Sequence, residues 1–517
     1  MNKRYNKLFY RILLVSSFLL VNIAVLFGIS QVLSFLNTGA DRTSMLHINF
    51  EKKEVYRPKL LWQDSINPGR PIEKFTMRSI QSDYLKSWYV RQNSFAKTET
   101  IGISDYFTQN AKKKLVEHVN YLALNKTHIA GTTLSHNLNL DFLSSDGQLA
   151  ICTDKNVRAY QKVYHKGELI QQGNTVSTYK IVFLLEDGFW KIRHMVKQPV
   201  TKQLDTFHNT QYFTIKNDKV YYKNKRFKIK GVNYYPKDSP WDMFGEEFDI
   251  DKISKDFELI KTSGLNTLRI FLQYEDFGKD HVKKGKLKKL DAVLKSAEKL
   301  GLKVIVTLFD FYGDYSVLDW TLTHRHAEQI VSYFSNNQTI LAWDIKNEPD
   351  LDFENRGEEE VIAWLEEMVY QVKKHAPKQL VTIGWSTIDK ALVLNDKVDL
   401  LSFHYYEDIK YFADKYKTLQ TNSEQPLILG EFGISSNFGF WAPFGKSETD
   451  QANYHKQFQE LIKKNQINFM SWTLYDFTKI PISVVGRLPW RKKQQQHFGF
   501  IDKSGNKKPS FKYINYE

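Results

Sequence analysis

Short apolar segments alternate with amphipathic helical segments eight times between Phe227 and Thr473, and this repeat limits the possible folds. The segments expected as strands are Phe227–Asn233, Thr267–Phe271, Lys303–Leu308, Leu341–Lys346, Leu380–Ile383, Leu400–Phe403, Leu427–Leu429 and Phe469–Thr473. Helices are expected between them at Ile253–Ser263, Leu287–Leu300, His324–Phe334, Glu358–His375, Ile409–Leu419 and Thr449–Lys464, with a weak helical segment after the fifth strand. Strands that are apolar throughout are typical of a parallel sheet buried on both faces. Eight such units in about 290 residues match the size of a (β/α)8 TIM barrel.

The alternative for such a repeat is an open, doubly wound α/β sheet. That fold usually carries a glycine-rich phosphate-binding fingerprint after its first strand. No such fingerprint follows Phe227–Asn233. The sequence therefore favours the α/β class with a (β/α)8 barrel over residues 206–517.

The preceding segment, residues 71–200, has a different pattern. Helices are expected at Ile72–Arg91 and at Ser104–Leu122, where Ser104 is the expected cap. Strands are expected at Thr132–Phe142, Leu149–Val163, Asn174–Leu185 and Gly188–Val196, and the pattern breaks around Pro199–Asn209. Helices followed by long antiparallel strands predict an α+β domain. Its element order resembles the NTF2-like (cystatin-like) cone fold, which implies a homodimer contact, a ligand pocket or an export-machinery partner; a simple spacer is the alternative.

An uncharged apolar run, Ile12–Leu36, lies near the start of the chain. Its 25 residues exceed the roughly 20 that a helix needs to span a bilayer. Four basic residues precede it and favour a cytoplasmic N-terminus: Lys3, Arg4, Lys7 and Arg11. We therefore expect a cytoplasmic segment (1–11), a transmembrane anchor (12–36), a linker (37–70) and a barrel outside the cytoplasmic membrane, periplasmic or extracellular. A signal peptide cleaved near Ala40 is the alternative.

Composition excludes several other classes. The formal net charge is +15, but the lysines are scattered, and neither zinc-finger spacing nor an aromatic-basic RNA motif is present. Nucleic acid is therefore not an expected partner. The chain has a single cysteine, Cys152, so it has no intramolecular disulfide. Aromatic residues make up 14% of the chain, which suits sugar binding but is equally explained by large cores.

Polar residues gather where the predicted barrel strands end, which is where TIM-barrel enzymes carry their active sites. Strand four ends in Asn347-Glu348 and strand seven in Gly430-Glu431, two glutamates 83 residues apart. The ends of strands two, six and eight carry Arg269, His404-Tyr405-Tyr406 and Trp472. Strands four and seven face each other across the barrel mouth. Glu348 and Glu431 can therefore flank one glycosidic bond, the arrangement that glycoside hydrolysis requires.

Six segments resemble glycoside hydrolase clan A, most closely family 5, which contains cellulases and mannanases. They are Gly231-Val232-Asn233-Tyr234-Tyr235, Leu268-Arg269-Ile270, Trp343-Asp344-Ile345-Lys346-Asn347-Glu348-Pro349, Phe403-His404-Tyr405-Tyr406, Gly430-Glu431-Phe432-Gly433 and Ser471-Trp472. The segments occur in the family's order along the barrel. One departure concerns the segment after strand three, where many members carry a histidine. Here Asp310 or Tyr312 stands in its place, so the resemblance does not carry over the substrate contacts of that histidine.

The resemblance implies a role for each matched residue. Glu348 would be the acid/base and Glu431 the nucleophile of a retaining enzyme, with the two carboxyl groups about 5–5.5 Å apart. Arg269 would keep Glu431 ionised by charge pairing. Asn347 would bind the sugar 2-hydroxyl, Tyr406 or Tyr405 would hydrogen-bond Glu431, His404 would line the cleft and Trp472 would form the sugar platform at subsite −1. No metal or organic cofactor is implied. A structural ion pair for Arg269 and a core position for His404 are the alternatives.

The sequence thus predicts a membrane-anchored retaining β-glycoside hydrolase acting on a β-linked glucan, mannan or exopolysaccharide. A transglycosylase of the same fold and a non-catalytic carbohydrate-binding or assembly protein are the alternatives. Trp385, Trp441 and Trp490 are possible further sugar-binding rings.

Overall fold

The computed structural model describes residues 13–29, 56–64, 69–199, 212–438, 445–486 and 488–515. The expected cytoplasmic segment, the domain boundary near 199–209 and Trp441 lie wholly or mostly outside these ranges. Residues 13–29 form a helix with exposed apolar side chains, among them Phe18, which is 66% exposed. Of the helices that the structure describes, none is long and apolar enough to cross a membrane.

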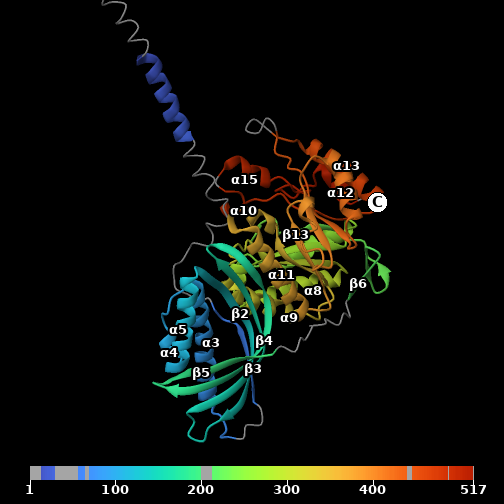
Figure 1. The fold of residues 1–517 in the computed structure, drawn as a ribbon. Coiled ribbons are helices and arrows are strands. Elements are labelled where there is room, and N and C mark those ends of the chain that lie inside the picture. Colours follow the sequence, from blue (N-terminus) through green and yellow to red (C-terminus); the bar gives the residue numbers. More distant parts are fainter. Residues whose placement is uncertain are drawn as a thin grey trace, which may run out of the picture.

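Eight parallel strands close into a barrel in chain order, which confirms the predicted (β/α)8 fold (Figure 1). The last strand pairs with the first through Met470 and Gly231. The strands are β9 (Lys230–Asn233), β10 (Thr267–Gln273), β11 (Lys303–Asp310), β12 (Ile340–Asn347), β13 (Leu380–Trp385), β14 (Leu401–Tyr405), β15 (Leu427–Phe432) and β16 (Asn468–Ser471). Because all eight run the same way, their carboxyl ends meet at one mouth.

Amphipathic helices surround the barrel. They are α6 (Ile250–Thr262), α8 (Lys284–Lys299), α9 (Trp320–Tyr333), α11 (Glu358–His375), α12 (Phe412–Thr421) and α13 (Glu448–Asn465). Side-chain caps fix two of their starts: Asp249 accepts hydrogen bonds from the first turn of α6, and Ser447 forms a capping box with Asp450 at α13. Only the short 3-10 helix η3 (Ile388–Lys390) follows β13, where a weak helical segment was expected.

A three-stranded sheet closes the end of the barrel away from the mouth. It consists of β6 (Phe213–Lys216), β7 (Lys219–Tyr222) and β8 (Lys225–Arg226). Phe213 and Val220 pack against residues near the amino ends of the barrel strands, including Ile305 and Leu380. The barrel is therefore filled at this end, and the opposite mouth is left for a site.

The N-terminal unit combines three helices with a five-stranded sheet that has its own hydrophobic core (Figure 1). The helices are α3 (Lys74–Lys97), α4 (Ile103–Tyr106) and α5 (Gln109–Leu124), and the strands are β1 (Lys59–Asp64), β2 (Thr127–Leu143), β3 (Leu149–His165), β4 (Glu168–Glu186) and β5 (Phe189–Gln198). The expected helix Ser104–Leu122 is divided, because Phe107 is extended and bridges to Ile192 in β5. Ser104 therefore lies inside α4, and its prediction as a cap is wrong.

Part of the segment expected to be a linker is ordered structure. Residues 59–64 form β1, which pairs in parallel with β2, and Tyr56 is buried. The backbone N–H of Arg57 donates to Oγ1 of Thr321 in the barrel helix α9 at 2.9 Å. A polar sequence with prolines predicts a linker, but strand pairing with a distant partner is not visible in such a local pattern.

Buried contacts join the N-terminal unit to the barrel. Arg158 of β3 makes a bidentate pair with Glu367 of α11, at 2.8 and 2.7 Å. Lys162, also in β3, lies 2.6 Å from Glu360. Tyr160 stacks on Trp320 of α9, with ring centroids 4.3 Å apart. The sheet is thereby held against the barrel beside the helices that follow β11 and β12.

Candidate active site

A cleft of about 780 Å³ opens at the carboxyl ends of the barrel strands. Its lining residues include Asn347, Glu348, Tyr406, Glu431 and Trp472, so five of the seven predicted site residues share one cavity. The other two, Arg269 and His404, are buried next to the cleft residues and contact them directly. The structure thus brings all seven together at the predicted mouth.

Arg269 is the centre of a buried hydrogen-bond network although only 1% of its surface is exposed. Its Nη1 donates to Oε1 of Glu431 at 2.6 Å, and its Nη2 donates to Oδ2 of Asp344 at 2.6 Å. Oδ1 of Asn347 also accepts from Nη2, at 2.9 Å. A Cβ atom at position 384 would come within 2.7 Å of Nη2, so Gly384 leaves the room that this guanidinium needs.

The charge of Arg269 is balanced by two carboxylates. Burial alone lowers the pKa of Arg269, but the carboxylates of Asp344 and Glu431 raise it above its ordinary value. Asp344 is fully buried and also accepts from Thr307 Oγ1 at 2.7 Å and from the backbone of Gly384 at 2.9 Å. Arg269 therefore stays positively charged and holds one side of Glu431 in a fixed position.

Glu348 lies at a sharp turn where β12 ends. Its φ of +48° is left-handed, a conformation that costs a non-glycine residue about 1–2 kcal/mol. The turn is held because the backbone N–H of Glu348 donates to the carbonyl of Gly384 at 2.7 Å. Nδ1 of His404 lies 3.0 Å from Oε1 of Glu348, which orients this carboxyl group toward the cleft.

Glu348, His404 and Glu431 form a compact cluster. One nitrogen or oxygen atom from each lies within 4.8 Å of the other two, so the nearest carboxylate oxygens of Glu348 and Glu431 are at most 4.8 Å apart. Retaining glycosidases hold their two carboxyl groups about 5–5.5 Å apart, and inverting ones about 6.5–9.5 Å. The cluster could also hold a metal ion by distance alone. However, the hydrogen bond between His404 and Glu348 is sufficient to explain why these side chains lie close together.

Tyr406, rather than Tyr405, contacts Glu431. The hydroxyl of Tyr406 donates to Oε2 of Glu431 at 2.9 Å, whereas Tyr405 is buried and donates to the carbonyl of Asp408. Both oxygens of Glu431 therefore have a partner, because Oε1 accepts from Arg269. The sequence left open which of the two tyrosines contacts Glu431. Consecutive side chains at a strand end point in opposite directions, so only one of them can do so.

Aromatic rings form one wall of the cleft. Trp472 is 6% exposed and packs near Trp241 and Phe271, with ring centroids 6.1 and 6.2 Å apart. Tyr235 stacks on Phe271 at 5.0 Å and lines the same cavity. Trp241 was not among the predicted site residues. The signal that could have found it is its position in the loop after the first barrel strand, at the mouth.

The end of β11 and the residue after it contribute Asp310 and Phe311 to the cleft. The hydroxyl of Tyr235 donates to Oδ2 of Asp310 at 3.2 Å. The pKa of Tyr235 is raised, mostly by burial and secondly by the charge of this carboxylate. Tyr312, the other residue considered at this place, is 4% exposed and does not line the cleft. Of the two residues considered at this place, Asp310 is therefore the one that reaches the cleft.

Other tryptophans considered as sugar-binding rings lie elsewhere. Trp385 is 1% exposed and Trp490 is 55% exposed, and neither lines the cleft. Arg491, next to Trp490 in α15 (Pro489–Gln495), does line it and was not predicted. This helix has only seven residues, too few to show an apolar periodicity, so the sequence gives no local signal for the place of Arg491.

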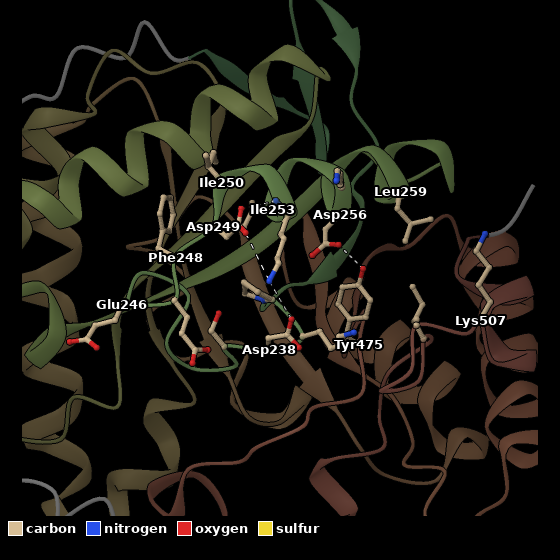
Figure 2. Close-up of a pocket in the computed structure, with 18 residues that line it drawn as sticks. Asp238, Glu246, Phe248, Asp249, Ile250, Ile253, Asp256, Leu259, Tyr475 and Lys507 are labelled. Atoms are coloured by element: carbon tan, nitrogen blue, oxygen red, sulfur yellow. Dashed lines mark hydrogen bonds and ion pairs between the residues drawn. The ribbon is translucent and has the colours of Figure 1, made fainter.

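A separate cavity of about 830 Å³ lies on the flank of the barrel, between the start of α6 and the C-terminal segment (Figure 2). Asp256 in this cavity accepts hydrogen bonds from Tyr475 at 2.6 Å and from Tyr234 at 2.7 Å. Other carboxylates that line this cavity include those of Asp238 and Asp249, and each lies within 4 Å of Lys252. None of the predicted site residues lines this cavity. Asp238, Asp249 and Asp256 thus each have a partner, and the predicted site residues lie in or beside the cleft at the mouth instead.

A closed parallel barrel with paired glutamates at its mouth defines a TIM-barrel glycoside hydrolase. The sequence matches the family described as Cellulase (glycosyl hydrolase family 5) over residues 220–478, half of its length, and the chain belongs to this family.

Individual relatives are more distant. The mannan endo-1,4-beta-mannosidase A of Emericella nidulans is 25% identical over 248 residues, which cover 37% of this chain and 63% of that protein. The beta-glucuronidase of Chlorocebus aethiops is 24% identical over 294 residues, 51% of this chain and 41% of the relative. The chain thus spans less than two thirds of the length of either. Among solved structures, an exo-beta-1,4-mannosidase from Opitutaceae bacterium strain TAV5 has a TM-score of 0.47 and 18% identity, covering 56% of this chain and 58% of that one.

Proposed function

We propose that this enzyme is a retaining β-glycoside hydrolase of a β-linked polysaccharide, with Glu431 as nucleophile and Glu348 as acid/base. The observation that carries the proposal is the close approach of the two carboxylates, at most 4.8 Å between nearest oxygens. This spacing leaves no room for the water that an inverting enzyme places between substrate and base.

The reaction has two displacements. In the first, an oxygen of Glu431 attacks the anomeric carbon while Glu348 donates its proton to the leaving oxygen, so that the glycosidic bond breaks and a glycosyl ester forms. In the second, Glu348 takes a proton from a water molecule whose oxygen attacks the same carbon and releases Glu431. The free sugar keeps the β configuration because two inversions occur.

The neighbouring side chains suit these steps. Arg269 and Tyr406 each hold one oxygen of Glu431, which limits the carboxylate to one orientation. Because Oδ1 of Asn347 accepts from Arg269, the Nδ2 donors of this amide remain for a sugar hydroxyl. Trp472 offers an apolar ring in the cleft, where a pyranose can pack its C–H face.

The substrate class is proposed from the relatives, which include a mannan-cleaving enzyme and a beta-glucuronidase. A β-linked mannan, glucan or exopolysaccharide is therefore the expected polymer. Interception of the glycosyl ester by a sugar rather than water would make the enzyme a transglycosylase, the second reading of the same site.

We also propose that residues 12–36 anchor the enzyme in the cytoplasmic membrane with the barrel outside, and that residues 71–200 have an NTF2-like fold. The apolar side chains exposed along residues 13–29 support an anchor. Extraction of cell membranes with alkaline carbonate tests this, because an anchored chain stays in the pellet and a peripheral one is released.

Turnover on defined substrates tests the catalytic proposal. Wild-type enzyme is incubated with β-mannosides, β-glucosides and β-glucuronides and with the corresponding β-linked polysaccharides, and the products are separated by chromatography. We expect release of sugar from at least one substrate and its loss in both Glu348→Ala and Glu431→Ala. Wild-type rates in both variants would contradict the site, and transfer products longer than the substrate would favour the transglycosylase.

A further inference from the structure

A second cavity adjoins the active-site cleft at the junction of the barrel and the N-terminal unit. Its volume is about 430 Å³, and both units line it. From the N-terminal unit come Ala96, Ala130, Lys162 and Tyr164, and from the barrel come residues 314–318, Asn355, Arg356 and Glu360. Asn355 lines the active-site cleft as well, so the two hollows meet at this side chain.

A third cavity continues the path onto the N-terminal unit. It measures about 590 Å³ and is lined by Ala96, Lys97, Thr98, Ala123, Lys126, Thr127, His128, Lys166 and Gly167. Ala96 belongs to both the second and the third cavity. Because alanine is a small residue, two hollows that it lines are neighbours. We call the three neighbouring cavities the junction groove.

The ends of the junction groove differ in charge. The catalytic end carries the carboxylates of Glu348 and Glu431 that the reaction uses. In the middle, Lys162 is paired with Glu360 at 2.6 Å. The far end has three exposed lysines, and among the described residues no acidic side chain lines that cavity. Cationic groups are therefore concentrated at the end that lies away from catalysis.

An aromatic pair connects the middle cavity to the far one. Tyr164 lines the middle cavity and His128 lines the far cavity, and their rings stack with centroids 4.7 Å apart and an interplanar angle of 8°. Both rings lie on the sheet that is held against the barrel by the buried pair of Arg158 and Glu367. The groove therefore has fixed walls on both sides.

The position of Glu348 indicates which part of a substrate enters the groove. The acid/base protonates the leaving oxygen, so the leaving sugars lie on its side of the cleft. Asn355 belongs to the segment that follows Glu348 beyond β12, and the second cavity adjoins the cleft at Asn355. We infer that the second and third cavities of the groove are on the leaving-group side of the scissile bond.

We propose that the junction groove binds the leaving-group side of an anionic β-linked polysaccharide, whose carboxylates pair with Lys97, Lys126 and Lys166. This inference rests on the proposed function, because it takes the cleft at Glu348 and Glu431 as the point of cleavage. The N-terminal unit is then a part of the substrate-binding surface and recognises charge outside the active-site cleft.

Binding to two matched polymers tests the groove. Carboxymethylcellulose and hydroxyethylcellulose have the same β-linked backbone, and only the first carries carboxylates. The full chain with Glu431→Ala, in mild detergent and about 0.15 M salt, is titrated with each polymer by calorimetry. We expect about tenfold tighter binding of carboxymethylcellulose, since three exposed ion pairs each contribute a small factor. Adding Lys97→Glu, Lys126→Glu and Lys166→Glu should abolish this preference, and the three Lys→Gln changes should reduce it.

A matched control separates the groove from the general positive charge of the protein. Lys417→Glu, Lys456→Glu and Lys464→Glu change the net charge equally, on α12 and α13, which Figure 1 shows on the side of the barrel away from the sheet. These changes should leave the preference intact. An absent preference, one that survives the groove changes, or one lost equally in the control would overturn the inference. The proposed function fails separately, if wild-type enzyme and the Glu431→Ala variant show equal turnover of β-glycosides.

Discussion

The guanidinium of Arg269 lies 2.6 Å from the carboxylate of Glu431, and the side chains of both residues are almost completely buried, with 2% and 6% exposed. A charge pair of this kind fixes the position of the proposed nucleophile and ties it to the interior of the barrel. The same guanidinium reaches Asp344 and Asn347, so one residue links strands β10, β12 and β15.

Replacement of Arg269 tests this link. Arg269→Lys keeps the charge, but an ammonium group cannot donate along the same fork to Glu431, Asp344 and Asn347. We expect kcat/KM to fall by about 100-fold or more and the free energy of unfolding to fall by about 3 kcal/mol. Kinetics and urea denaturation measure the two effects, with Arg226→Lys on the exposed strand β8 as control. A folded variant with wild-type kcat/KM would contradict the role of the pair.

Two adjacent tyrosines provide an internal comparison. Tyr406→Phe removes the hydroxyl that donates to Glu431 at 2.9 Å, and we expect kcat to fall by roughly 10- to 100-fold. Tyr405→Phe removes a hydroxyl that donates to the carbonyl of Asp408 and should leave kcat close to wild type. Steady-state kinetics on both variants decides the matter, and equal losses would show that Tyr406 has no special place at Glu431.

The contact between the two units depends on Arg158. Arg158→Met would leave the carboxylate of Glu367, whose side chain is 0% exposed, with His324 as its remaining partner. We expect the free energy of unfolding at pH 7 to fall by about 3–5 kcal/mol. Arg70→Met, at an exposed ion pair with Glu73, should change it little. Urea denaturation gives both values, and a loss no larger than that of the control would refute the structural weight of this pair.

Lowering the pH should reduce the stabilisation that the same pair provides. Burial raises the pKa of Glu367, but the hydrogen bonds from His324 and Arg158 outweigh it and lower the pKa to about 2. Because the folded pKa is below the ordinary value near 4.5, the stabilisation is present above that pH and is lost as pH falls toward 2. Wild type should therefore lose more stability than Arg158→Met between pH 5 and about 3. Parallel curves for the two proteins would count against this assignment.

Asp319, at the start of α9, should have the opposite effect on the pH dependence of stability. Burial and the neighbouring Asp314 raise the pKa of Asp319 from 3.8 to about 8. The folded state then keeps a proton that the unfolded state has lost, so stability falls as pH rises from about 4 to 8. Asp319→Asn should raise Tm relative to wild type at pH 9 and change it less at pH 5. Scanning calorimetry at both pH values, with Asp414→Asn on exposed α12 as control, checks this, and an equal shift at both would contradict it.

The alternation of apolar and helical segments was sufficient to predict the barrel, because a buried parallel strand has no polar face and each helix has only one apolar face. It also placed Glu348 and Glu431 correctly, since carboxyl ends of parallel strands meet by topology. The division of Ser104–Leu122 could not be foreseen, because the bridge of Phe107 to Ile192 joins residues distant in sequence. The same holds for β1, which is defined only by its pairing with β2.

The side chains that line the cleft at the mouth were harder to predict from the sequence. Tyr405 and Tyr406 are identical in type and adjacent, and only the exact end of β14 decides which of them points into the cleft. Trp241 comes from a loop and Arg491 from the short helix α15, and neither segment is regular and long enough for periodicity to link position to burial. The placement of Glu348 and Glu431 at the mouth could therefore be predicted, whereas several residues that line the cleft beside them could not.

Rescue by azide tests the central claim most directly, because it reports on each glutamate separately. The substrate is the dinitrophenyl β-glycoside of a sugar that wild-type enzyme hydrolyses, and the anomer of the glycosyl azide is determined by NMR. In Glu431→Ala, azide should enter the space left by the carboxylate and give the α-glycosyl azide. In Glu348→Ala, the ester forms on Glu431 and azide should displace it, which gives the β-glycosyl azide. The reverse assignment of the two anomers, or wild-type hydrolysis by either variant, would contradict the account.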